Sequence, residues 1–258
     1  MSIAVVTGAS RGIGRALVDR LVAADRTVVA LARSVDGLAD VEGVVPYALD
    51  VADPDAVADV FERVLTEVGV PDLLVNNAAI SGGSALTLGL SEADWWRVME
   101  VNVRGTVACC RAVVPAMTAR GSGRIINVSS GAATFPIGPD HDGQLTSAYM
   151  ASKAAVNRFT EALAGEVRAS GVFVFAISPG TVKTDMTAEV FADEWESEEG
   201  WTPMAASLDL MLDLDSGLLD RLTGRYFRAA SDDWRALAAQ ADDLLERDTM
   251  VQRLVTHD

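Results

Sequence analysis

Residues 3–14 read Ile-Ala-Val-Val-Thr-Gly-Ala-Ser-Arg-Gly-Ile-Gly, a short apolar run that leads directly into a glycine-rich turn. Apolar residues continue at helical spacing from Ile13 to Ala24, so this stretch predicts a strand, a turn and a helix in succession. Glycines in such a turn let backbone N–H groups approach a pyrophosphate at the helix N-terminus. The stretch therefore predicts a dinucleotide-binding turn, with a purely structural turn as the alternative.

The same alternation continues along the chain. Further strands are predicted at 27–32, 44–49, 73–77, 124–129, 172–178 and 225–228, and helices at 54–68, 91–120 and 147–170. Continuous apolar strands that alternate with helices indicate a parallel sheet with both faces covered. The predicted fold class is α/β, a Rossmann-type doubly wound parallel sheet with helices on both faces, in a single domain of residues 1–258.

Composition narrows the range of partners. A formal net charge of −16 disfavours sequence-independent binding to nucleic acid or to an anionic membrane. No apolar run approaches the ~20 residues of a membrane span, and the first strand begins close to Met1, so a cytoplasmic protein without a secretory signal is expected. The only cysteines, Cys109 and Cys110, are adjacent, a geometry that rarely forms a disulfide. They are expected to be buried helix residues, and no metal site is predicted.

The end of the second predicted strand bears on cofactor choice. It reads Leu31-Ala-Arg-Ser, where a site for NAD(H) would be expected to place a carboxylate on the adenosine ribose. Arg33 stands there instead, and with Arg11 of the glycine turn it can pair with a 2′-phosphate. NADP(H) is therefore predicted over NAD(H); the alternative is that both arginines are solvated surface residues. Asp50 follows the third strand and could accept a hydrogen bond from adenine, or cap the helix that begins near Pro54.

Tyr149-Met-Ala-Ser-Lys153 places a phenol and an ammonium four positions apart on a predicted helix. A phenol is a poor acid or base at neutral pH because its pKa is near ~10, and a cation one turn away is a means of lowering that pKa. Of the 21 basic residues only Lys153 and Lys183 are lysines, so a Tyr and a Lys at this spacing are seldom expected by chance. The spacing suggests an enzyme.

Several motifs in order resemble those of the short-chain dehydrogenase/reductase (SDR) family, over about residues 3–186. They are the glycine turn, Asn76-Asn-Ala-Ala79, Asn102, Ser129-Ser130, Tyr149-Met-Ala-Ser-Lys153 and Pro179-Gly180. The resemblance implies an oxidoreductase that interconverts a carbonyl and an alcohol by hydride transfer.

The resemblance also implies residue roles. Tyr149 would be the general acid/base, and Lys153 would lower its pKa and hold the nicotinamide ribose. Ser130 would hydrogen-bond the substrate carbonyl, with Ser129 as the alternative. Asn102 would hold a water that links Lys153 to solvent. The cofactor-binding set is Gly8, Ser10, Arg11, Gly12, Ile13, Gly14, Arg33, Asp50, Val51, Asn77, Ala78, Tyr149, Lys153, Pro179, Gly180, Val182 and Thr184.

The chain departs from the family pattern at three places. Ala79 replaces a glycine, and the stretch from Ser130 to Tyr149 is longer than in many relatives, which predicts a loop at 135–145 near the substrate. His141 in that loop is expected to be exposed, or to touch substrate or a metal. A helical tail at 232–258 replaces the usual end of the family.

Residues 186–202 occupy the place of a substrate lid and carry six acidic residues. If they face the substrate they disfavour anionic partners such as acyl carrier protein or coenzyme A; the alternative is a solvated acidic face. Phe191, Trp195 and Trp201 in the same stretch favour an apolar ketone or aldehyde, or are packing residues.

Other functions on the same fold are weighed against the reductase. A catalytically idle, NADP-binding redox sensor would have no need of Tyr149, and epimerisation or dehydration usually needs a larger substrate region. A homodimer or homotetramer is expected, since the family commonly assembles through its long helices and its C-terminal end.

Overall fold

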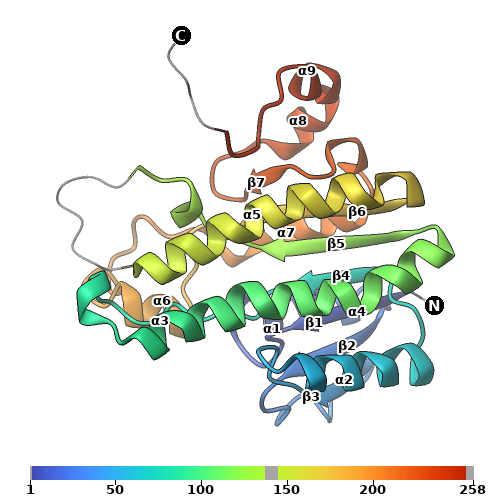
Figure 1. The fold of residues 1–258 in the computed structure, drawn as a ribbon, viewed down its shortest axis with the longest axis horizontal. Helices are drawn as coiled ribbons and strands as arrows, with labels where there is room; N and C mark the ends of the chain where they lie inside the picture. The colour runs from blue at the N-terminus through green and yellow to red at the C-terminus, as the bar shows by residue number, and fades with distance from the viewer. Residues whose placement is uncertain (1, 137–144, 254–258) are drawn as a thin grey trace.

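The computed structural model describes residues 2–136 and 145–253. A sheet of seven parallel strands runs through the molecule in the order β3-β2-β1-β4-β5-β6-β7 (Figure 1). The predicted doubly wound α/β fold is confirmed. The strands are β1 Ile3–Thr7, β2 Thr27–Ala32, β3 Val44–Ala48, β4 Leu73–Asn76, β5 Gly123–Val128, β6 Val172–Ser178 and β7 Tyr226–Arg228.

Helices cover both faces of this sheet. Figure 1 shows α4 and α5 side by side across one face, with α2 beyond α4, while β7 and the C-terminal helices lie on the other side of α5. The helices are α1 Gly12–Val22, α2 Pro54–Glu67, α3 Glu92–Met99, α4 Gly105–Arg120, α5 Ser147–Val167, α6 Asp185–Val190, α7 Met204–Asp215, α8 Trp234–Ala239 and α9 Ala241–Glu246.

Two apolar cores lie on opposite faces because successive strand residues point to opposite sides. Ala4 and Val6 of β1 join the core under α1 and α7, whereas Val5 between them joins the core under α2, α4 and α5. Cys109 and Cys110 are free and fully buried in that second core, as expected. Burial raises the pKa of Cys110 to about 12, so neither chemistry nor metal binding is assigned to this pair.

Side-chain caps fix where several of the helices begin. Asp53 accepts hydrogen bonds from the N–H groups of Asp55 and Ala56, so Asp53 and not Asp50 caps α2. Ser91 caps α3 by accepting from the N–H of Asp94. Thr146 caps α5 by accepting from the N–H of Tyr149, 3.2 Å away, which fixes Tyr149 in the first turn of that helix.

The structure differs from the predicted elements in three places. The predicted helix at 91–120 is interrupted by a π-helical turn at Glu100–Arg104. Helix α7 was not predicted, and the described part of the C-terminal tail forms two short helices rather than a continuous one. His141 lies outside the described residues. Within the described ranges no helix is long and apolar enough to cross a membrane.

Candidate active site

A cleft of about 240 Å³ lies beyond the carboxyl ends of the strands. It opens where the strand order reverses, with β1 between β2 and β4, which is the place where open α/β sheets bind ligands. Arg33 and Asp50 line one end and Tyr149 and Lys153 line the other. We call these the arginine end and the catalytic end.

The glycine turn forms the floor of the cleft. Gly8 has a φ of +65°, and a Cβ on Gly14 would lie 2.3 Å from the carbonyl oxygen of Gly8, so neither position accepts a larger residue without rearrangement. The Asn77 side chain donates to the carbonyl of Thr7 at 2.9 Å, and the Thr7 hydroxyl accepts from the N–H of Ala78 at 3.0 Å. Asn77 therefore ties β4 to the turn.

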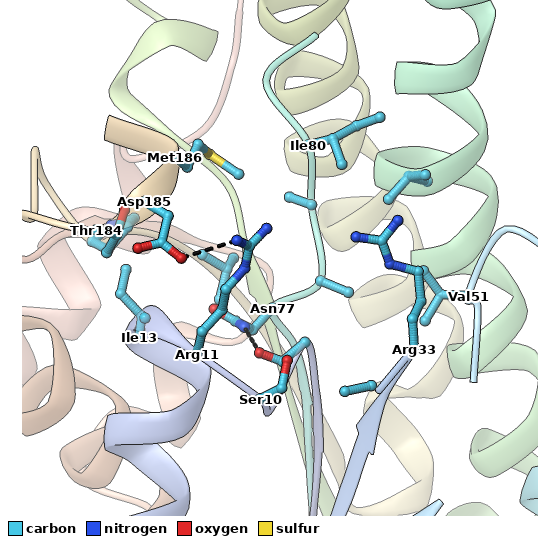
Figure 2. A pocket seen from close by; sticks show the side chains of 18 of the residues that line it. Ser10, Arg11, Ile13, Arg33, Val51, Asn77, Ile80, Thr184, Asp185 and Met186 are labelled. Atoms are coloured by element: carbon cyan, nitrogen blue, oxygen red, sulfur yellow. Dashed lines mark hydrogen bonds and ion pairs between the residues drawn. The ribbon is translucent and has the colours of Figure 1, made fainter. Parts of the chain in front are cut away.

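Arg33 of the arginine end and Arg11 across the cleft from it are both exposed. Figure 2 shows Arg11 and Arg33 on the two sides of the cleft, with Arg11 beside Asp185. Arg11 pairs with Asp185 at 2.9 Å, and both side chains are about 70 % exposed (68 % and 71 %). Arg33 is exposed and forms no ion pair with the residues that the structure describes. Its guanidinium is therefore available to an anionic ligand.

Asp50 of the same end is held by two partners. It accepts from the N–H of Ala52 at 3.0 Å and from the Arg97 guanidinium at 2.6 Å. Burial alone would raise the pKa of Asp50, but these hydrogen bonds and the cation outweigh burial, so the pKa lies below its usual value. Asp50 is thus a fixed, ionised acceptor at the cleft.

Tyr149 at the catalytic end is only 8 % exposed. Burial raises the pKa of its phenol; a hydrogen bond with Ser130 opposes that rise and the nearby Tyr226 adds to it. The sequence predicts a lowered pKa from the neighbouring Lys153, so the direction here is the opposite. The reason is geometric, because the ammonium lies 5.6 Å from the centre of the Tyr149 ring and donates its hydrogen bond to the backbone carbonyl of Val128.

Lys153 is 2 % exposed, and its ammonium donates to the carbonyl oxygen of Val128 at 2.8 Å. Burial lowers the pKa of Lys153 from 10.5 to about 8. The residue is therefore still mostly charged at neutral pH, yet it can exchange its proton close to that pH.

The two serines after β5 point to different partners. The Ser129 hydroxyl donates to the backbone carbonyl of Lys153 at 3.1 Å and so fastens β5 to α5. The Ser130 hydroxyl instead accepts from the N–H of Ala132 at 3.2 Å and lies close enough to the Tyr149 phenol to oppose the rise in its pKa. Of the two, Ser130 is the one beside the phenol.

Asn102 sits within the π-helical turn, a feature common at functional sites. Its side chain accepts from the N–H of Ile80 at 2.9 Å and donates to the Ser152 hydroxyl at 2.9 Å, while its backbone carbonyl accepts from Thr106. Asn102 therefore connects the strand end after β4 to the helix that carries Tyr149 and Lys153.

Most of the predicted cofactor residues come together in one cleft. It is lined by Gly8, Ser10, Arg11, Gly12, Ile13, Arg33, Asp50, Val51, Asn77, Ala78, Tyr149, Lys153, Pro179 and Thr184. Gly14, Gly180 and Val182 lie outside that lining, with Val182 buried at 3 % exposure. A long cleft with a glycine turn in its floor and an available guanidinium fits a dinucleotide with an additional phosphate.

The sequence analysis missed several residues of this cleft. Arg97 had no signal in the sequence, because only the fold places it against Asp50. Ile80, Asp185 and Met186 also line the cleft. Met186 belongs to α6 at the start of the predicted lid, so the lid does contribute to the site.

The aromatic residues of the predicted lid pack on one another. The rings of Trp195 and Trp201 meet edge to face at 5.5 Å, and Phe191 meets Trp201 at 6.3 Å. The Lys183 ammonium lies 5.5 Å from Trp195 and 5.2 Å from Trp201, within cation–π range. None of the three aromatic residues lines the cleft in the part of the chain that the structure describes, which favours their interpretation as packing residues.

Comparisons with known proteins agree with this architecture. A family model described as short chain dehydrogenase matches residues 2–195. The chain is 39% identical over 194 residues to Short chain dehydrogenase MYCFIDRAFT_6125 of Pseudocercospora fijiensis, covering 72% of this chain but only 61% of that relative. It is 35% identical over 197 residues to the 3-oxoacyl-[acyl-carrier-protein] reductase FabG of Salmonella typhimurium, covering 74% and 78% of the two chains. A short-chain dehydrogenase structure from Streptomyces avermitilis has a TM-score of 0.74, with 28% identity and 96% of each chain covered.

Proposed function

This chain belongs to the short-chain dehydrogenase family, whose members are oxidoreductases with nicotinamide cofactors, and on that premise we propose that it is an NADP(H)-dependent enzyme that interconverts a carbonyl and an alcohol. The observation that carries the proposal is the Tyr149 phenol, which lines the cleft at the end opposite Arg33 and has Ser130 next to it behind the cleft lining. An acid and a hydrogen-bond donor thus stand together where a carbonyl oxygen would gain charge.

The proposed chemistry follows from the protonation states of these residues. When bound, the nicotinamide group supplies or takes up a hydride. Ser130 hydrogen-bonds the carbonyl oxygen, and Tyr149 donates its proton to that oxygen as charge develops there. A phenol whose pKa is raised by burial is fully protonated at neutral pH, which suits the reductive direction. Lys153, with a pKa of about 8, replaces the proton on Tyr149, and Asn102 holds the water that links Lys153 to solvent.

The preference for NADP(H) rests on Arg33. Its exposed guanidinium stands at the end of β2, where it can make a bidentate contact with a 2′-phosphate. Arg11 is the second candidate, although Asp185 competes for it. Asp50 is an ionised acceptor that can receive the adenine amino group. Gly14, Gly180 and Val182 complete the cofactor site from beneath the cleft.

The proposed substrate is a small, neutral, apolar ketone or aldehyde. Ile80 and Met186 give the cleft apolar walls, and residues 193–199 are mostly exposed acidic residues that oppose an anionic substrate. In this proposal the substrate differs from that of the FabG relative, whose name specifies an acyl-carrier-protein substrate. The catalytically idle redox sensor is not favoured, since Asn102, Ser130, Tyr149 and Lys153 are all present.

The test is oxidation of NADPH and of NADH by purified protein over a panel of aldehydes, ketones, diketones and quinones, with Tyr149→Phe run in parallel. We expect turnover with NADPH that falls about 10²- to 10⁴-fold in the variant. Tight NADPH binding without turnover on any carbonyl would contradict the reductase function and would support the catalytically idle redox sensor instead.

We further propose that the protein acts in the cytoplasm as a homodimer or homotetramer. The long helices α4 and α5 lie side by side at one surface (Figure 1) and offer a broad face to a second copy. Light scattering on the purified protein measures the mass of the assembly, and a monomer at working concentration would contradict this part of the proposal.

A further inference from the structure

A second cavity, of about 330 Å³, lies between α5, β7 and the C-terminal segment. It shares no lining residue with the cofactor cleft among the described residues. Figure 1 shows β7, α8 and α9 on the side of α5 away from α4, which is where this cavity lies. Its volume is within the range of ~300–1,000 Å³ that is typical of small-molecule sites.

Asn157 of α5 is the polar centre of this cavity. The residue is 7 % exposed, and both its amide oxygen and its amide nitrogen are buried without a hydrogen-bond partner in the described structure. Leaving a buried amide unpaired is costly, so native proteins nearly always satisfy such groups with protein, water or ligand. Asn157 can both donate and accept, and it therefore matches a ligand group that does the same.

The positive and negative charges that line the cavity are equal in number. Arg158 pairs with Glu161, and Arg228 pairs with Asp232 at 2.8 Å. No net charge is left among these four lining residues to attract an ion. The ligand that fits is therefore neutral.

Apolar side chains form one part of the remaining wall, and Thr134, Tyr226 and Gln252 form the rest. Leu237, Met250 and Val251 line the cavity opposite α5. They would cover an apolar body attached to the polar group at Asn157, whereas a cluster of waters would gain little from such a wall.

Ion pairs and a hydrogen bond hold the C-terminal segment across the cavity. Arg253 pairs with Glu161 at 2.6 Å, and Asp248 pairs with Arg225 at 2.8 Å. The Gln252 side chain donates to the carbonyl of Ala133 at 2.9 Å, three residues after Ser130. The wall is therefore held in place, and it ends beside the turn that carries the proposed substrate-binding serine.

We propose that this cavity is a second ligand site, distinct from the cofactor cleft, which takes a small neutral molecule with a carboxamide-like group on Asn157 and an apolar chain over Leu237 and Met250. A carboxamide is the group that satisfies both amide atoms of Asn157 at once, by one donated and one accepted hydrogen bond. The proposal does not depend on the reductase function.

The test is binding of hexanamide, measured by ligand-observed NMR on the full chain with saturating NADPH present, so that the cofactor cleft is filled. We expect saturable binding to the wild type and at least tenfold weaker binding to Asn157→Leu. Hexanoate, which has the same chain length but carries a charge, should bind far more weakly than hexanamide.

Two further variants keep the result interpretable. Gln240→Leu makes the same change from amide to apolar group on an exposed residue and should bind hexanamide as the wild type does. Leu237→Trp, which fills the cavity from the opposite wall, should lose binding even if Asn157→Leu does not fold. Equal affinity in the wild type, Asn157→Leu and Leu237→Trp, or no saturable binding to the wild type, would overturn the proposal and leave water as the occupant.

Discussion

The two ends of the cofactor cleft are built in opposite ways. At the catalytic end, Tyr149 and Lys153 are 8 % and 2 % exposed, the backbone of Tyr149 is fixed by the Thr146 cap of α5, and the Lys153 ammonium donates to Val128 of β5 at 2.8 Å. At the arginine end, Arg33 reaches into solvent, as does Arg11 on the other side of the cleft. Burial controls proton affinity, whereas an exposed guanidinium provides a contact that salt and competing carboxylates weaken. We therefore expect changes at the catalytic end to alter turnover, and changes at the arginine end to alter cofactor affinity.

The largest effect is expected from Lys153→Met. Loss of the ammonium should lower turnover about 10²-fold or more, since Tyr149 could no longer be reprotonated through it. The melting temperature should not fall, because the change removes a charge that burial already disfavours. Steady-state kinetics and thermal unfolding on the same preparation test both parts. A large drop in melting temperature would mean that Lys153 is mainly a structural residue.

The pKa of Lys153 is directly measurable because the chain has only two lysines. An NMR titration of ¹⁵N- or ¹³C-labelled lysine should give two signals, one of which titrates near pH 8 and disappears in Lys153→Met. The folded-state pKa lies below the 10.5 of an ordinary lysine, so the unfolded chain binds more protons between about pH 8 and 10.5. This residue's contribution to stability should therefore rise with pH across that window. Two signals that both titrate above pH 10 would refute the burial argument.

At the arginine end, Arg33→Ala should weaken NADPH binding about 10- to 100-fold, as expected for the loss of hydrogen bonds to a charged group. Binding of NADH should change little, because it lacks the 2′-phosphate. Fluorescence titration with each cofactor measures the two constants. Arg63→Ala, which removes the same charge from the exposed face of α2, is the matched control. An equal loss of affinity for both cofactors would assign Arg33 another role.

The smallest effect is expected from Asp185→Asn. This change removes the ion pair between Arg11 and residue 185, in which both side chains are exposed. The free energy of unfolding should therefore change by less than ~1 kcal/mol. NADPH affinity should rise a few-fold at low salt, and the gain should shrink as salt is added. Unchanged NADPH affinity at low salt would indicate that Arg11 does not contact the cofactor.

The sequence predicted the elements whose pattern is local. Strands Ile3–Thr7 and Val172–Ser178 have the predicted bounds, because each is an apolar run that ends near glycine or proline. Helix α7 was missed, since Leu208-Asp-Leu-Met-Leu-Asp-Leu-Asp alternates like a strand, whereas in the structure it is a helix that shares a core with α1.

Features of the site that depend on tertiary contacts were less predictable. The spacing of Tyr149 and Lys153 indicated a functional pair, but the direction of the phenol pKa depends on burial and on the bond from Lys153 to Val128. In the same way, nothing in the sequence placed Arg97 on Asp50. The Asp53 cap is different, because an Asp directly before Pro54 is a local signal for a helix start that was not used.

The central claim is that the catalytic end controls turnover and the arginine end controls cofactor affinity. One set of measurements on Tyr149→Phe and Arg33→Ala tests it most directly. Equilibrium titration gives the NADPH affinity of each variant, and a single-turnover experiment at saturating NADPH gives the rate of carbonyl reduction. We predict that Tyr149→Phe keeps its affinity but loses the reaction rate, and that Arg33→Ala loses affinity but keeps the rate once saturated. If both variants lose the same quantity, the two ends do not have separate roles and the account is wrong.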